Sequence, residues 1–109
     1  MQVFNHHIYE FKKGVRDMVL CTLLASYEDK VKAKLDKNEI SYMIQRQRNG
    51  NINVFFGKKE CLIVANTLCE NKTLDQLTPE EDFMLGILLG YNICEQCTRY
   101  CKRRKVIMP

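Results

Sequence analysis

The chain has 109 residues, of which 46% are hydrophobic and 28% charged, with a formal net charge of +4. This length fits a single domain, residues 1–109, and excludes a second core. The longest apolar stretch, residues 83–94, is shorter than the ~20 residues that cross a bilayer. No basic start followed by an apolar block opens the chain. We therefore expect a cytoplasmic protein, away from membranes, whose six cysteines are reduced thiols.

The apolar pattern predicts helix, strand, helix, strand, strand, helix, a short turn and a long helix, in that order. Four positions with helical spacing predict the N-terminal helix, namely Phe4, Ile8, Phe11 and Val15. The near-continuous apolar run at residues 17–24 is typical of a buried strand. A lysine-rich helix over residues 27–37, a hairpin over 42–56 and a helix over 58–70 follow.

Alternation of apolar residues fixes the register of the predicted hairpin. A three-residue loop that ends at Gly50 pairs Ile44 with Val54 and Tyr42 with Phe56, so all four side chains share one face. A two-residue turn would mix the faces. The longer loop also puts Gly50 at the left-handed position that such loops require.

The last helix has the clearest start in the chain. Thr78 is placed to cap it, Pro79 to occupy its first position and Glu81 to complete the capping box. The helix is predicted to continue for some 25 residues, or roughly 37 Å.

The predicted fold class is α+β. A three-stranded sheet carries a β-α-β-β-α core that resembles a ferredoxin-like plait without its fourth strand, extended by the N-terminal helix and the long C-terminal helix. Right-handed crossover predicts the strand order first, third, second, with the helices on one face.

Three cysteines near the end of the chain have a spacing that permits two interpretations. Cys94, Cys97 and Cys101 could hold zinc or one edge of an iron–sulfur cluster, with His6 or His7 as a fourth ligand if the N-terminal helix lies alongside. In one continuous helix they would instead share a face with core positions, and we expect mostly buried thiols without metal or cofactor. A thioredoxin-like role is disfavoured because such pairs lie at a helix N-terminus.

Five basic residues occur within seven positions at the end of the predicted long helix: Arg99, Lys102, Arg103, Arg104 and Lys105. They are explained either as a solvated helix end that complements the helix dipole, or as a docking site for an acidic protein near Arg99, Lys102, Arg103 and Lys105. The modest net charge argues against nucleic acid.

A homodimer is predicted from two features. Met43 and Phe55 pair on the sheet face that lacks a predicted helix, where they would lie outside the core and need covering. Gly86 and Gly90 form a notch of small residues in a helix that is longer than this domain needs. Close packing within one chain is an equally good explanation of the notch.

Three stretches carry a family resemblance over nearly the whole chain: Val19 to Leu23, Ile52 to Cys61 (INVFFGKKEC), and Leu77 to Tyr91 (LTPEEDFMLGILLGY) with the three cysteines after it. They resemble a small family of bacterial proteins catalogued as a domain of unknown function. The resemblance implies three strands, five helices, a homodimer and an association with flavodoxin. It implies no activity and no catalytic residues.

The chain lacks the motifs of a phosphate-binding loop, a nucleophile elbow or an HExxH metal helix. We therefore expect a non-enzymatic interaction or regulatory module that acts as a homodimer. The alternative is a metal-binding or redox accessory protein that uses the cysteine cluster and serves an electron-transfer partner such as flavodoxin.

Overall fold

The computed structural model describes residues 1–106 and places three strands, five α-helices and two 3-10 turns in them. The strands are β1 (Met18–Leu24), β2 (Ser41–Arg46) and β3 (Asn51–Gly57). The helices are α1 (Gln2–Lys12), α2 (Glu28–Lys37), α3 (Lys59–Cys69), α4 (Pro79–Leu88) and α5 (Ile93–Arg104). The turns are η1 (Ala25–Tyr27) and η2 (Leu74–Gln76). The α+β class is confirmed.

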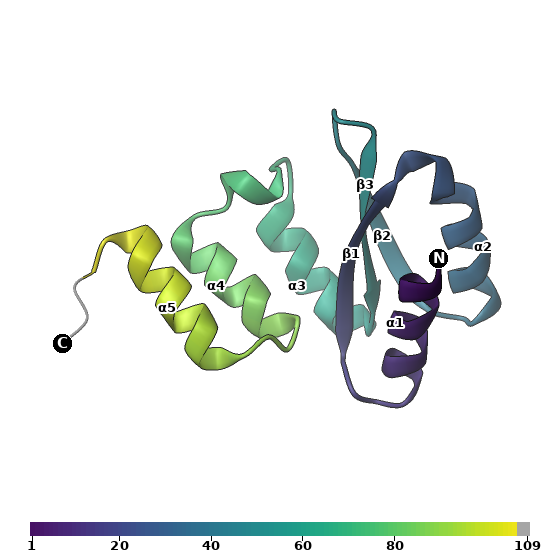
Figure 1. Ribbon diagram of the computed structural model, residues 1–109, viewed down its shortest axis with the longest axis horizontal. Coiled ribbons are helices and arrows are strands. Elements are labelled where there is room, and N and C mark those ends of the chain that lie inside the picture. The colour runs from purple at the N-terminus through teal and green to yellow at the C-terminus, as the bar shows by residue number, and fades with distance from the viewer. Residues whose placement is uncertain (107–109) are drawn as a thin grey trace.

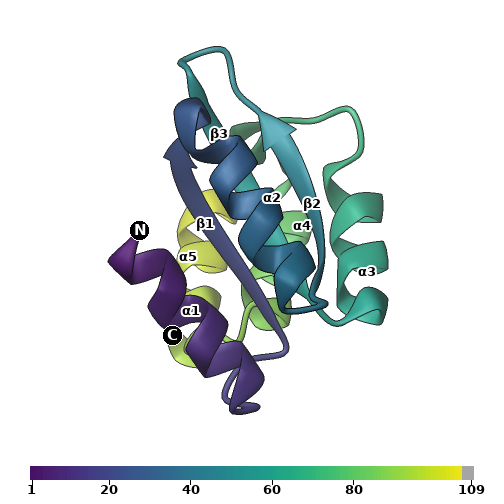
Figure 2. The same cartoon turned by 90° about the vertical axis from the view of Figure 1, so that its right-hand side faces the viewer.

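β3 is the middle strand of an antiparallel sheet with the order β1-β3-β2 (Figure 1, Figure 2). Ile44 pairs with Val54 and Tyr42 with Phe56, and Gly50 has a φ of +85°. The predicted strand order, hairpin register and loop are therefore confirmed. The alternation of apolar side chains was sufficient to select this register because a slip of one residue would turn all of them to the other face.

α1 and α2 cover one face of the sheet (Figure 1). The buried side chains on this face form one hydrophobic cluster. Both helices contribute buried side chains to it, and all three strands contribute side chains to it or pack against it. Its fully buried members include Val19, Val31, Leu35, Ile52, Val54 and Phe56. The ring of Phe4 meets Phe56 edge to face, with ring centroids 5.6 Å apart. This is the core that the sequence pattern predicted.

α3 and α4 lie on the other face, so the prediction of helices on one face is wrong. Phe55 is fully buried there and Met43 packs against the same cluster. The expectation that these two side chains lie outside the core is therefore also wrong. The physical reason is the central strand itself, since every side chain from Ile52 to Phe56 is buried and apolar residues on both faces need a covering layer.

The predicted long helix is two helices folded back on each other (Figure 1). Its start is as predicted, because Thr78 and Glu81 form a capping box and Pro79 follows the cap. Gly90 then adopts a φ of +76°, which ends α4, and the Asn92 side chain accepts a 3.0 Å hydrogen bond from the backbone N–H of Glu95 to begin α5.

The layers follow one another along the long axis of a molecule whose principal extents are 49 × 33 × 24 Å. α1 and α2 come first, then the sheet, then α3, α4 and α5 (Figure 1). Each helix within residues 1–106 is too short or too polar to cross a bilayer.

The two-sided core predicts that neighbouring residues on β3 are equally important for stability. Phe55→Leu and Phe56→Leu should each lower the free energy of unfolding by about 1 to 3 kcal/mol, because each leaves space in a fully buried cluster. Phe83→Leu, at a half-buried position on α4, is the control and should cost less. Urea unfolding measures all three, and a loss confined to Phe56→Leu would show that one face alone is covered.

Candidate functional site

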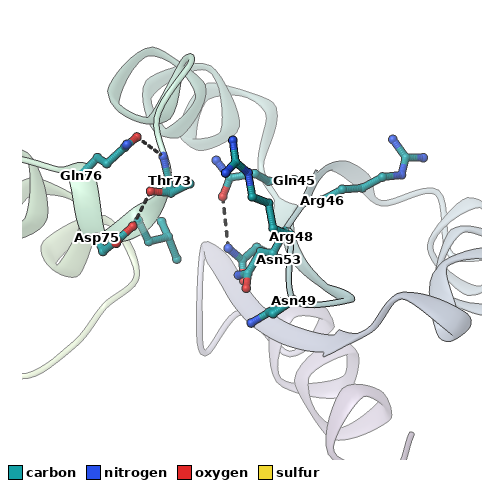
Figure 3. Close-up of a pocket in the computed structure, with 10 residues that line it drawn as sticks. Gln45, Arg46, Arg48, Asn49, Asn53, Thr73, Asp75 and Gln76 are labelled. Atoms are coloured by element: carbon teal, nitrogen blue, oxygen red, sulfur yellow. Dashed lines mark hydrogen bonds between the residues drawn. The ribbon is translucent and has the colours of Figure 1, made fainter.

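A polar pocket of about 730 Å³ lies between the tip of the β2–β3 hairpin and the η2 turn (Figure 3). Its polar lining comes from two separate parts of the chain, residues 45–53 and residues 73–76. From the hairpin come Gln45, Arg48 and Asn53, and from the η2 region come Thr73, Asp75 and Gln76. The β2–β3 loop fixes one wall and the capping box of Thr73 and Gln76 fixes the other.

A row of polar side chains crosses the sheet beside the pocket, and two of its members, Gln45 and Asn53, line the pocket. Thr22, Asn53 and Gln45 are neighbours in register on the three strands. The Thr22 hydroxyl donates to Asn53 Oδ1 at 2.7 Å, and Asn53 Nδ2 donates to Gln45 Oε1 at 3.1 Å. Asn53 is 1% exposed, so these bonds replace the water that its amide would otherwise need.

The row continues out of the sheet to α4. Gln45 Nε2 donates to the Lys72 carbonyl at 2.6 Å, and Lys72 Nζ lies 2.6 Å from Glu81 Oε2. The Lys72 ammonium, together with the backbone N–H of Thr78, holds the pKa of Glu81 below its usual range. One chain of hydrogen bonds therefore connects the sheet with the first turn of α4.

The two arginines of the hairpin have different surroundings. Arg46 points away from the pocket (Figure 3) and pairs with Glu28, whose carboxylate lies 3.0 Å from Nε and 2.5 Å from Nη2. Arg48 extends in a different direction, and its guanidinium overlaps Gln45 in this view (Figure 3). Asp75 is the one carboxylate among the residues that line the described cavity. This lining suits hydrogen bonding to a polar surface.

Neither the pocket nor the polar row beside it was predicted from the sequence. Asn53 was the available signal, because asparagine is depleted in strands and here interrupts the apolar run from Ile52 to Phe56. A polar residue at a position that the alternation buries requires a partner from a neighbouring strand. Thr22 on β1 and Gln45 on β2 are the hydrogen-bond partners of Asn53.

Two of the three cysteines lie near the start of α5 and not toward the end of a long helix. Cys94 is the second residue of α5 and Cys97 the fifth, and both are exposed, whereas Cys101 is half-buried. The prediction of mostly buried thiols is therefore wrong. Because Gly90 ends α4, α5 meets α4 through a different face, which includes Tyr100, and the cysteines do not continue the stripe of α4.

The candidate metal ligands are not brought together. His6 belongs to α1, which lies on the opposite side of the sheet from α5 (Figure 1). Within residues 1–106, no three His, Cys, Asp or Glu side chains are grouped so that they could hold a metal ion. The sequence spacing was compatible with a metal site, but the fold places His6 away from the cysteines of α5.

The basic residues of α5 are largely paired with the acidic first turn of α4. Arg99 Nε lies 2.6 Å from Asp82 Oδ2, and Arg104 Nε lies 2.8 Å from Glu80 Oε2. Arg103 donates a 2.8 Å hydrogen bond to the Leu77 carbonyl and also approaches Asp82 at 3.6 Å. These contacts hold the two helices antiparallel.

Two of the predicted docking residues differ from the arginines. Lys102 and Lys105 are exposed, and neither makes an ion pair within the part of the chain that the structure describes. The predicted docking set of Arg99, Lys102, Arg103 and Lys105 is thus split between paired arginines and solvated lysines.

The residues predicted for a dimer interface serve the single chain. A methyl group on Gly86 would collide with the Gln96 side chain of α5, so the small residue allows the two helices to approach. Gly90 forms the turn between them. Met43 and Phe55 are covered by α3 and α4. The alternative of close packing within one chain therefore explains the notch, and the homodimer itself stays a prediction.

One family model matches nearly the whole chain. The chain belongs to the DUF2023 family. The family model, described as a protein of unknown function, matches residues 2–103, which include every strand and all of α5 except its last residue. No curated protein matches the chain. The match confirms the resemblance to a small family of unknown function, and the family description supplies no activity to transfer.

The buried polar row predicts an uneven cost of removing asparagines from β3. Asn53→Ala should lower the free energy of unfolding by about 1 to 3 kcal/mol, because Gln45 and Thr22 lose their shared partner in a half-buried place. Asn51→Ala, on the same strand but outside the row, should cost less than about 0.5 kcal/mol. Thermal or urea unfolding gives both values, and equal costs would contradict a structural role for the row.

Proposed function

We propose that this domain is a non-enzymatic protein-interaction module that acts as a homodimer. The supporting observation is a set of exposed apolar side chains on α3 and α4, two helices that pack on each other. Ile63 is 67% exposed and Met84 47%, and Val64 and Ile87 add to them. Large apolar side chains exposed on two neighbouring helices are typical of a surface that meets another protein.

A second copy of the chain is the occupant that fits this surface best. The four side chains are uncharged, so the same patch on two copies can meet without opposing like charges. Closed two-fold dimers use one patch in this way and are the commonest soluble assemblies. The polar pocket beside Arg48 and Asp75 suits additional hydrogen bonding more than proton transfer, in keeping with a binding role.

Sedimentation tests the dimer with a matched pair of variants. The wild-type chain should sediment as a dimer at micromolar concentration. Ile63→Glu should weaken association by about tenfold or more, since a carboxylate buried at the interface costs well over ~1.4 kcal/mol. Val3→Glu is the control, because Val3 is equally exposed, at 70%, but belongs to α1 on the far side of the sheet.

Either of two results would contradict the proposal. A wild-type chain that sediments as a monomer at micromolar concentration would refute the homodimer. If Ile63→Glu weakens the dimer no more than Val3→Glu does, α3 and α4 do not form its interface. Both substitutions are at exposed positions, so folding should survive them.

We further propose an acidic protein partner, such as a flavodoxin, at the end of α5. Lys102 and Lys105 support this proposal because their charges are solvated, whereas the neighbouring arginines are engaged by Asp82 and Glu80. Charges of this kind mainly speed encounter and set orientation, and salt screens them.

Titration against an acidic flavodoxin at low and at high salt tests this partner. The double change Lys102→Ser and Lys105→Ser should weaken binding at low salt, and high salt should reduce the difference. Lys30→Ser with Lys37→Ser on α2 removes the same charge elsewhere and is the control. Absence of binding at low salt would refute the partner, and equal effects of the two double variants would refute the site.

A further inference from the structure

The start of α5 carries two exposed thiols one helical turn apart. The Asn92 cap begins the helix, Cys94 is its second residue and Cys97 its fifth. Both side chains are exposed. Redox-active C-x-x-C pairs lie near the N-terminus of a helix. The break at Gly90 gives this pair such a position, which a single long helix would have denied it.

The remaining cysteines are protected by their positions. Burial raises the pKa of Cys21 to about 11, and burial also raises the pKa of Cys61 and of Cys69. A thiol must lose its proton to attack a disulfide, so these three are poor nucleophiles at neutral pH. Cys101 lies one turn beyond Cys97 and is half-buried. The fold therefore separates one accessible pair from cysteines that serve packing.

We propose that Cys94 and Cys97 form a redox-active dithiol that exchanges with accessible disulfide bonds. This activity would be additional to the interaction role and does not depend on a dimer. With oxidised glutathione as the oxidant, the Cys94 thiolate attacks one sulfur, the glutathione S–S bond breaks, and one glutathione leaves as a thiolate that takes up the proton lost by Cys94. The Cys97 thiolate then attacks the Cys94 sulfur and expels the second glutathione, which takes the proton of Cys97. The protein dithiol loses two electrons and the glutathione disulfide gains them.

The helix geometry permits this bond after a small local adjustment. Residues three apart in a helix have Cα atoms about 5 Å apart, which lies within the range of disulfides. Their Cβ atoms, at roughly 5 to 6 Å, must approach to about 3.5 to 4.5 Å. The adjustment falls on the first turn of α5, where Asn92 accepts hydrogen bonds from the backbone N–H groups of Glu95 and Gln96. The contacts of Arg99 and Tyr100 with α4 lie beyond Cys97 and hold the rest of α5 in place.

Equilibration with glutathione followed by alkylation and peptide mass spectrometry tests the proposal on the full reduced chain. As the fraction of oxidised glutathione rises, the thiols of Cys94 and Cys97 should disappear together and the peptide should carry an internal disulfide. Cys21, Cys61, Cys69 and Cys101 should remain open to alkylation after the protein is denatured. Circular dichroism of the oxidised protein should keep its helical signal.

Single substitutions assign the two roles. Cys97→Ser should stop the reaction at a mixed disulfide between Cys94 and glutathione, because the resolving thiol is missing. Cys101→Ser, the matched control from the same helix, should behave as the wild type does. Independent glutathione adducts on Cys94 and Cys97 without an internal bond would overturn the proposal. A Cys97–Cys101 disulfide, or a chain that stays fully reduced, would overturn it as well.

Discussion

The arrangement of the elements on the α3 side of the sheet depends on the hydrogen bonds of one buried group, the side-chain amide of Asn53. An unsatisfied amide in a central strand would cost more than most single contacts contribute, so Thr22 and Gln45 must stand beside it in register. The Nε2 group of Gln45 donates a hydrogen bond to the Lys72 carbonyl, and this bond fixes the position of the segment after α3. The Lys72 side chain in turn holds Glu81, and with it the start of α4. The register of the strands, the position of the segment after α3 and the placement of α4 therefore depend on the same set of hydrogen bonds.

The parts of the fold that the sequence predicted are those with local signals. The hairpin register follows from the alternation of Tyr42, Ile44, Val54 and Phe56, and the start of α4 follows from the capping residues around Pro79. Covering of both sheet faces was harder to predict, because it requires knowing that the helix after β3 returns to the face opposite α2. Phe55 and Met43 were recognised as apolar on that second face, but a partner chain was expected to cover them.

The break between α4 and α5 shows why periodicity alone missed the arrangement of the site. Apolar residues continue at helical spacing from Ile87 through Tyr91 to Cys94, so the pattern hides the turn. The evidence for two helices is local: Gly90 can end one, and Asn92 with Glu95 three positions later can begin another. Because two helices stand in place of the predicted one, the cysteines and the arginines have different surroundings from those predicted, although both segments are helical as predicted.

The hairpin of α4 and α5 is held together differently from the rest of the domain. α5 has no buried residue among those described, and it is attached through carboxylate–guanidinium pairs and the edge-to-face rings of Phe83 and Tyr100. Half-exposed ion pairs contribute little to stability and are weakened by salt. Because its ion pairs are screened by salt and it buries no side chain of its own, we expect the docking of α5 on α4 to depend more on ionic strength than the two-sided core does.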